Sequence, residues 1–212
     1  MKINKMTKSA FALTLALSIY GASASHNVNA AKSFTDIKQG AWYENAVEWG
    51  ISKDMIKGYQ DGTFKPNKTV SEAEFLAMLL RAFEPNLGSN KYENWTVPYY
   101  ERAKELNYPV KSYENSETKH KPILRKNVAE LISATEGVNY SGDNAIHYLL
   151  AFGLADGTNP NEVTVENFKG EKELTRAEAI KIIKNFYDYG IGGLLERPKE
   201  PSDPKDLPPI RL

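Results

Sequence analysis

Apolar side chains recur at a helical period in three separate segments of this chain. In each segment, four apolar or small side chains occupy positions i, i+3, i+4 and i+7, which lie on one face of an α-helix. The three sets are Phe75, Met78, Leu79 and Ala82; Val128, Leu131, Ile132 and Thr135; and Ala179, Ile182, Ile183 and Phe186. The first members of the sets are 53 and 51 positions apart. The pattern predicts three amphipathic helices and indicates an internal repeat of nearly constant length.

A shorter helix is predicted before each of these three. Each carries an alanine followed, three positions later, by a larger side chain, in the pairs Ala46 and Trp49, Ala103 and Leu106, and Ala145 and Tyr148. Twelve positions after each alanine stands Gly58, Asn115 or Gly157. Glycine and asparagine accept positive φ more readily than other residues, so we expect the chain to turn there. Each unit is then a helix, a turn, a loop and a second helix.

These units predict an all-α fold with three tandem helix-loop-helix repeats, at residues 31–84, 91–137 and 138–189, the second of them degenerate. The apolar stripes need a partner surface, and packing of the six helices against one another within one chain is the simplest way to bury them. Exchange of a repeat between two chains would also bury them.

The two ends of the chain depart from this pattern. Residues 1–30 combine three lysines with a short apolar run and small residues, which is typical of a secretory signal peptide cleaved after Ala24 or Ala30. The run is about half as long as the roughly 20 residues of a membrane-spanning helix, so we expect no membrane contact after cleavage. Residues 190–212 are rich in glycine and proline, and we expect an extended or disordered tail that serves as a solvated terminus or a spacer.

Composition narrows the classes of function. The chain has no cysteine, which excludes disulfides and thiol chemistry, and its 41% of apolar residues suffice for a packed core. Without the three lysines of residues 1–30, the mature chain has 24 basic and 27 acidic side chains, a net charge of −3. This balance argues against nucleic acid as a partner, because such binding needs a basic field. An anionic ligand would have to be met by local basic residues.

The starts of the second helices carry the candidate chemistry. Ser71 with Glu74 and Thr175 with Glu178 form capping boxes, in which a hydroxyl and a carboxylate satisfy free backbone donors. Arg176 follows the second cap, where the helix dipole disfavours a cation. A basic side chain beside free N–H groups makes a compact anion site, so we interpret Arg176 as a ligand-binding residue rather than a solvated surface arginine. On this interpretation, Arg176→Ala leaves the melting temperature nearly unchanged.

The corresponding positions of the other two units differ. The second unit has lost the capping box but keeps two cations, Arg125 and Lys126, and for Arg125 a solvated surface position is an equal alternative. The first unit has Glu72, which suits the helix dipole and repels an anion. We therefore expect one or two working anion sites rather than three. The candidate ligand-binding residues are Arg176, Arg125, Lys126, Thr175 and Gly157.

Residues 34–189 resemble three tandem S-layer homology (SLH) repeats. The likeness is clearest in the first unit, extends to both ends of the third and is poor in the second, which lacks the Asp-Gly-Thr-Phe turn. The residues that carry it are Phe34-Thr35-Asp36, Trp42, Ala46, the turn from Gly58 to Pro66, and the signature segment Thr175-Arg176-Ala177-Glu178.

The resemblance implies a fold, a ligand and a location. In this family three repeats form one pseudo-threefold helical spindle, which binds secondary cell-wall polysaccharide without a covalent bond, typically through a pyruvate ketal on the glycan. The basic residue of the Thr-Arg-Ala-Glu-like segment meets the pyruvyl carboxylate, which implies Arg176 first and Arg125 second. We therefore expect a secreted protein held in the cell wall or S-layer of a Gram-positive surface, with no cofactor and no metal.

An enzyme that cleaves wall glycan is the first alternative. The sequence has no nucleophile elbow, no metalloprotease motif and no phosphate-binding glycine loop, and Asp61-Gly62 lacks the alternating oxygen ligands of a calcium loop. Paired carboxylates would suit a hydrolase, but 27 acidic residues make chance pairs unavoidable. We expect no catalytic residue, and a pure binder would release no new reducing ends from wall glycan.

An adaptor or assembly protein is the second alternative, with the tail after residue 190 as the candidate site for a protein partner. We expect no cargo domain after the repeats, and an S-layer lattice would need a separate assembly domain. If the chain is an anchor, deletion of residues 196–212 leaves wall binding intact and removes any recruitment of a partner.

Overall fold

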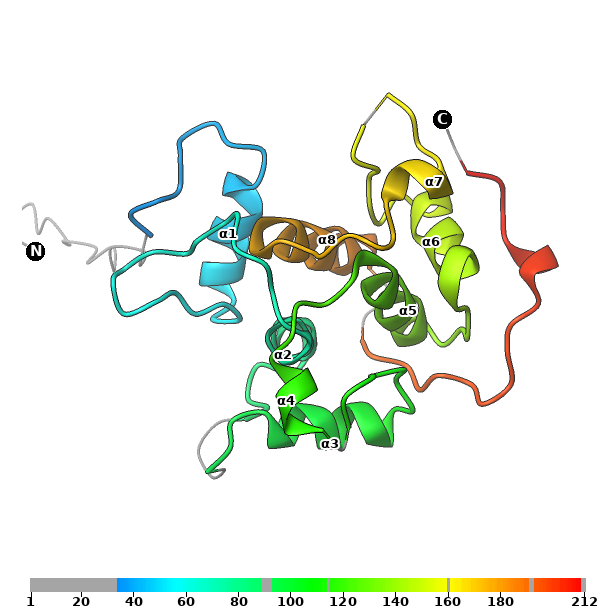
Figure 1. Ribbon diagram of the computed structural model, residues 1–212, viewed down its shortest axis with the longest axis horizontal. Helices are drawn as coiled ribbons and strands as arrows, with labels where there is room; N and C mark the ends of the chain where they lie inside the picture. The colour runs from blue at the N-terminus through cyan, green and yellow to red at the C-terminus, as the bar shows by residue number, and fades with distance from the viewer. Residues whose placement is uncertain (1–33, 89–92, 114, 160, 191–192, 211–212) are drawn as a thin grey trace, which may run out of the picture. The chain divides into compact units, whose positions relative to one another are not determined.

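The computed structural model describes residues 34–88, 93–113, 115–159, 161–190 and 193–210, and the expected signal peptide lies outside these ranges. In the described ranges the chain forms helices and no strand, which confirms the prediction of an all-α fold (Figure 1). The helices are α1 (Glu44–Ser52), α2 (Glu72–Phe83), α3 (Val97–Glu105), α4 (Ser116–Lys119), α5 (Arg125–Thr135), α6 (Gly142–Ala151), α7 (Val165–Phe168), α8 (Arg176–Tyr189) and the 3-10 helix η1 (Pro204–Asp206).

The three longer amphipathic helices lie where the periodicity predicts them. They are α2, α5 and α8, and they begin at Glu72, Arg125 and Arg176, which repeats the spacing of 53 and 51 positions. Every residue of the three predicted apolar stripes is buried. Both capping boxes are present, at Ser71 and Thr175, whereas α5 begins without a side-chain cap. The sequence pattern therefore fixes both the start and the buried face of these helices.

The first helix of each unit ends in a left-handed residue, but not at the predicted position. Positive φ occurs at Asp54, Asn107 and Gly153, directly after the ends of α1, α3 and α6. Positive φ is absent where it was predicted: Gly58 and Gly157 do not adopt it, and the φ of Asn115 is −109°. The left-handed residue comes earlier because it closes the C-terminus of the helix itself, and the chain turns again after Gly58, where Gly62 N–H donates to Tyr59 O at 3.0 Å.

Gly58 is required for a different reason, which is close packing. A Cβ atom on this residue would lie 2.2 Å from the ring of Phe34 and 2.7 Å from the carbonyl oxygen of Thr63. The same turn is held by Asp36, whose carboxylate accepts hydrogen bonds from the backbone N–H groups of Phe64 and Lys65, both at 2.7 Å. The Phe-Thr-Asp motif of the sequence thus anchors the turn that follows α1.

A closed ring of backbone hydrogen bonds joins the segments that precede the three longer helices. Val70 N–H donates to Leu174 at 2.9 Å, Leu174 N–H donates to Ile123 at 3.0 Å, and Ile123 N–H donates to Val70 at 3.0 Å. A second ring follows from the next residues, since the N–H groups of the first residues of α2, α5 and α8 donate to Lys121, Lys172 and Lys68 in turn. The three segments are therefore held in equivalent positions by equivalent bonds. This ring supports the predicted threefold arrangement of three repeats, which itself stays a prediction.

Each first helix packs against a longer helix from another unit. The helix α3 lies against α2, α6 against α5, and α1 against α8 (Figure 1). The last of these contacts joins the beginning of the described chain to its final long helix, so the helices bury one another within a single chain. Aromatic side chains line this contact: the ring centroids of Trp49 and Tyr187 are 5.2 Å apart.

Residues 193–210 form a strap that runs over the helices (Figure 1). Its backbone N–H groups at Leu195, Arg197 and Ser202 donate to carbonyl oxygens of Thr135, Leu106 and Asn139, at 2.9 to 3.0 Å. The Arg197 guanidinium also donates to Asn107 O at 2.7 Å. The strap is extended outside η1, but it does not form the solvated terminus or spacer that the sequence predicts.

Candidate functional site

The Arg176 side chain extends from the start of α8 to the turn that follows α1. Its Nε donates to the carbonyl oxygen of Phe64 at 2.8 Å, and its Nη2 donates to that of Lys57 at 3.0 Å. The side chain is only 5% exposed. The guanidinium carbon also lies 4.7 Å from the centroid of the Phe64 ring, a distance at which a cation is attracted to the ring face. Arg176 is therefore not a solvated surface arginine. Because its side chain holds the turn, we now expect Arg176→Ala to lower the melting temperature rather than leave it nearly unchanged.

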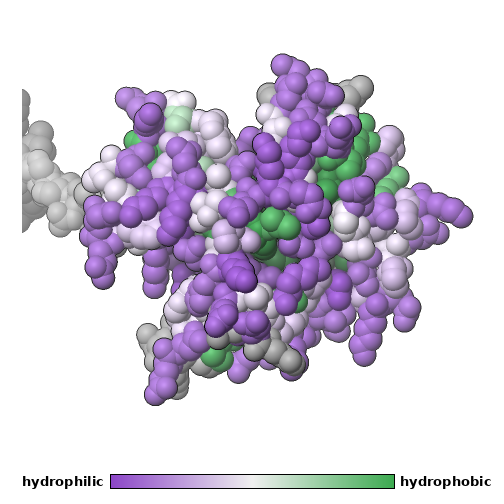
Figure 2. Space-filling view, in the orientation of Figure 1, coloured by the Kyte–Doolittle hydropathy of each residue, from purple (hydrophilic) through white to green (hydrophobic). Residues whose placement is uncertain are grey.

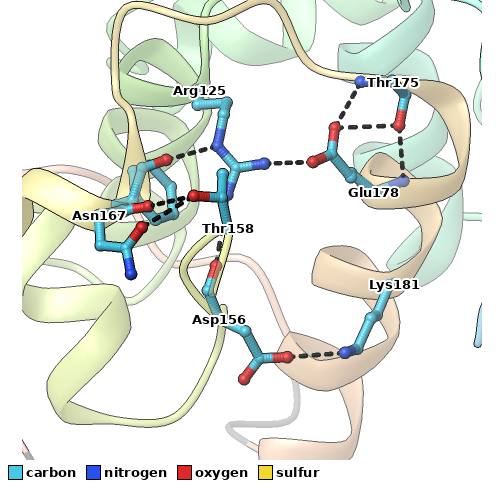
Figure 3. A network of polar contacts seen from close by, with 8 residues as sticks. Arg125, Asp156, Thr158, Asn167, Thr175, Glu178 and Lys181 are labelled. Atoms are coloured by element: carbon cyan, nitrogen blue, oxygen red, sulfur yellow. Dashed lines mark hydrogen bonds and ion pairs between the residues drawn. The ribbon is translucent and has the colours of Figure 1, made fainter. Parts of the chain in front are cut away.

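Arg125 makes the same contacts at the start of α5. Its Nε donates to Phe168 O at 2.7 Å, its Nη2 donates to Asp156 O at 3.3 Å, and its side chain is 4% exposed (Figure 3). Burial lowers the pKa of the guanidinium, and the nearby carboxylate of Glu178 opposes that shift. The alternative of a solvated Arg125 is therefore wrong as well. Both arginines connect the start of one long helix to the turn of another unit.

The capping boxes supply the carboxylates that face these arginines. Glu178 accepts from the Thr175 backbone N–H and hydroxyl at 2.9 Å, and its other oxygen lies 2.6 Å from Arg125 Nη1 (Figure 3). In the same way, Glu74 of the Ser71 capping box lies 3.5 Å from Arg176 Nη1. Thr175 thus acts on the site through Glu178, which caps its own helix and orients an arginine of another helix.

Arg125 lies in a groove with a volume of about 460 Å³, which we call the Trp42 groove. Its principal lining residues are Trp42, Arg125, Asp156, Gly157, Thr158, Glu178, Lys181 and Asn185. Gly157 fits tightly there, because a Cβ atom on it would lie 3.3 Å from the carbonyl oxygen of Asn167. Thr158 fixes the same loop by donating to the Asn167 side chain at 2.8 Å (Figure 3). The structure therefore brings together Arg125 and Gly157 among the predicted site residues.

Arg176 lies in a second groove of about 290 Å³, the Trp95 groove. Its principal lining residues are Lys57, Gly58, Tyr59, Glu74, Arg81, Trp95 and Arg176. A further hollow that contains Lys68 and His120 shares Glu74 and Trp95 with it. The two grooves match position by position, since a tryptophan, a buried arginine, a glycine turn and a capping glutamate recur in both.

The third equivalent position is filled by carboxylates of the chain itself. Glu72, which begins α2, accepts from the Tyr100 hydroxyl at 2.9 Å and from the Lys111 backbone N–H at 3.0 Å. Glu130 accepts from Gly142 N–H at 3.1 Å and lies 2.9 Å from Lys111 Nζ, with 9% of its side chain exposed. Burial acts to raise the pKa of Glu130, but the hydrogen bonds from Lys111 and Gly142 outweigh it, and the pKa lies below its usual value. This position holds two carboxylates where the others hold an arginine.

Lys126 does not reach either groove. Its Nζ lies 2.5 Å from Glu171, and it lines a separate hollow beside Lys169 and Lys172. The residues that the sequence analysis did not select for the site are Trp42 and Trp95, which are 58% and 46% exposed. They stand 53 positions apart, as the starts of α2 and α5 do. The repeat spacing in the sequence could therefore have identified them as equivalent residues.

Membrane-spanning helices, metal-binding clusters and surface hydropathy were each considered for the described part of the chain. The described part of the chain contains no helix long and apolar enough to cross a membrane. It also contains no cluster of three histidine or acidic side chains arranged to hold a metal ion. The face drawn in Figure 2 is mostly hydrophilic, with small hydrophobic patches between the hydrophilic residues.

Comparison with known proteins finds a family model that matches part of this chain. Residues 33–76, which include α1, its turn and the start of α2, match the model of the S-layer homology domain. The chain is 34% identical to cell surface glycoprotein 1 of Acetivibrio thermocellus over 29% of its own length and 3% of the relative. It is 25% identical to the middle cell wall protein of Brevibacillus brevis over 76% and 15% of the two lengths. A cellulosome-anchoring protein of Acetivibrio thermocellus is 28% identical over 38% of this chain and 18% of the relative.

The chain thus contains one recognised SLH domain and spans less than a fifth of the length of these relatives. The SLH match and the cell-wall and cell-surface names of the relatives support a location at the cell wall or surface. They also support cell-wall anchoring in general, because an SLH domain is a binding and anchoring module.

Proposed function

We propose that this chain is a non-enzymatic anchor that binds secondary cell-wall polysaccharide on a Gram-positive surface without a covalent bond. One observation carries the proposal: two grooves of the same construction each present a buried arginine beside an exposed tryptophan. A tryptophan face suits the apolar face of a sugar ring, and an arginine suits a carboxylate. The SLH match covers the turn that forms one wall of the Trp95 groove.

The arginines act in this proposal from the floor of each groove. Each uses its Nε and Nη2 to hold a turn, and its Nη1 faces a capping glutamate. A guanidinium has five N–H donors, so some remain for a ligand that enters the groove. The pyruvate ketal of a wall glycan is the ligand group that the family resemblance implies, and its carboxylate would accept from these donors in one or both of the grooves.

The direct test is sedimentation of residues 31–212 with purified Gram-positive walls, before and after chemical removal of the secondary polysaccharide. We expect the protein to sediment with intact walls and to remain in solution with stripped walls. A Trp42→Ala, Trp95→Ala double variant is the matched control, because both side chains are exposed and their loss leaves the buried core intact. Equal binding of wild type and double variant to intact walls would refute the proposal.

The adaptor alternative receives less support from the fold. The strap expected to recruit a partner is bonded to the helices of its own chain, through Leu195, Arg197 and Ser202. A hydrolase is tested separately by assaying purified wall glycan for new reducing ends, which an anchor does not release.

A further inference from the structure

The two grooves share their construction but differ in charge. In the Trp42 groove both cations are paired within the groove: Arg125 lies 2.6 Å from Glu178, and Lys181 lies 2.6 Å from Asp156. Two cations and two carboxylates therefore balance, and both pairs appear in Figure 3. An anion that entered this groove would be repelled by Glu178 and Asp156, whose carboxylates already neutralise the two cations.

The Trp95 groove lacks that balance. At the positions that correspond to Asp156, Lys181 and Asn185, it has Lys57, Ala77 and Arg81. Its capping carboxylate, Glu74, lies 3.5 Å from Arg176, compared with 2.6 Å for the equivalent pair. The three changes replace a carboxylate by a lysine, remove another lysine and add a second guanidinium, so that this groove has three cations and one carboxylate.

Arg81 is one of the two cations that these changes introduce, and Lys57 is the other. Within the described ranges, no carboxylate lies within ion-pair distance of its guanidinium, which stacks 5.1 Å from the Tyr99 ring centroid. Tyr99 is buried, and its ring centroid lies 6.2 Å from that of Trp95, so Arg81 and the exposed Trp95 both pack against the same tyrosine. Lys68 adds positive charge in the adjoining hollow, with its Nζ 4.8 Å from the Tyr59 ring.

We propose that the two grooves bind differently charged units of one polysaccharide, with the acid-bearing sugar in the Trp95 groove and an uncharged sugar in the Trp42 groove. This inference rests on the proposed function and adds to it the identity of the groove that selects for charge. The carboxylate of the ligand is met by Arg81 together with Arg176, and the sugar ring lies on Trp95. In the Trp42 groove the sugar lies on Trp42, and its hydroxyl groups bond to the paired side chains.

The test uses wall polysaccharide that binds the wild type, and the same preparation after its carboxyl groups are reduced to alcohols. Binding of residues 31–212 is measured by titration calorimetry for wild type, Trp42→Ala, Trp95→Ala, Arg81→Gln and Arg81→Lys. Circular dichroism checks that each variant is folded.

We expect Trp42→Ala to bind the native preparation and to lose binding to the reduced one. We expect Trp95→Ala to bind both preparations within about twofold of each other, because the remaining groove is charge-balanced. Arg81→Gln should weaken binding to the native preparation about tenfold, and Arg81→Lys should restore most of it, since one charge-assisted hydrogen bond contributes on that order. A reciprocal Asn185→Arg variant should bind the native preparation more tightly than wild type does.

Two results would overturn the inference while the proposed function stands. One is an equal preference of Trp42→Ala and Trp95→Ala for the native preparation, and the other is an unchanged affinity of Arg81→Gln. If wild type binds neither preparation nor intact walls, the proposed function itself has failed.

Discussion

Replacement of Arg176 by alanine is the sharpest test of how the sites are built. The variant loses the hydrogen bonds to Phe64 O at 2.8 Å and Lys57 O at 3.0 Å, and it leaves Glu74 without its cation. A hydrogen bond to a charged group contributes about 1.5–3 kcal/mol. Water that enters the vacated space recovers part of the loss, so we expect a net destabilisation of about 3–5 kcal/mol. For a chain of this size that corresponds to a fall of roughly 6–20 °C in melting temperature.

The measurement is urea and thermal unfolding of residues 31–212, followed by circular dichroism. Arg176→Lys is the matched control, because lysine keeps the charge near Glu74 but cannot donate to both carbonyl groups, and we expect an intermediate loss. If Arg176→Ala melts within about 2 °C of wild type, the buried bonding pattern is refuted. Wall-binding assays of this variant should be made below its own melting temperature.

Three further perturbations follow from the same geometry. At pH 7, Glu130→Gln should lower the free energy of unfolding and Glu136→Gln should raise it, because hydrogen bonds hold the pKa of Glu130 below its usual value whereas burial raises that of Glu136. The contribution of Glu130 to the free energy of unfolding is present above the pKa that it has in the unfolded chain. It is lost as the pH falls through the pKa of the folded chain, from about pH 5 downward. Urea unfolding of both variants at pH 7 and pH 3.5 therefore checks the sign of each effect. Ser71→Ala and Thr175→Ala should each cost about 1 kcal/mol, with the larger loss at Thr175 because Glu178 also holds Arg125 at 2.6 Å; equal losses in urea unfolding would contradict this coupling. Deletion of residues 193–212 removes the strap bonds, each contributing about 1 kcal/mol, and should lower stability by roughly 3 kcal/mol while wall binding persists; unchanged stability would show that the strap is not docked in solution.

The periodicity of apolar residues predicted the longer helices, because burial on one face is a local property of the sequence. It did not predict α4 and α7, since a helix of four residues contains no full period. In the second unit, the first helix was aligned with that of the first unit at the wrong residue. There the backbone N–H of Tyr108 bonds to Ala103 as that of Met55 bonds to Gly50, so Ala103 corresponds to Gly50 and not to Ala46.

The arginines of the site could be selected from the sequence because each follows the position of a helix cap. Their partners could not, because Arg176 bonds to Phe64 across 112 positions of the chain and Arg125 bonds to Phe168 across 43. Burial of a charged side chain depends on such distant carbonyl groups, and this is why the sequence leaves a solvated Arg125 open and does not predict that Arg176 holds a turn.

Each groove draws its residues from all three units, so a single unit does not contain a complete groove. The Trp95 groove needs Trp95 from before α3 and Arg176 from α8, although the turn beneath them belongs to the segment that matches the SLH model. The Trp42 groove likewise needs Arg125 from α5. The stretch of sequence that least resembles the family therefore contributes one residue to each open groove. Recombination that exchanged or shortened that stretch would disable both grooves at once, even though the best-matching repeat was left untouched.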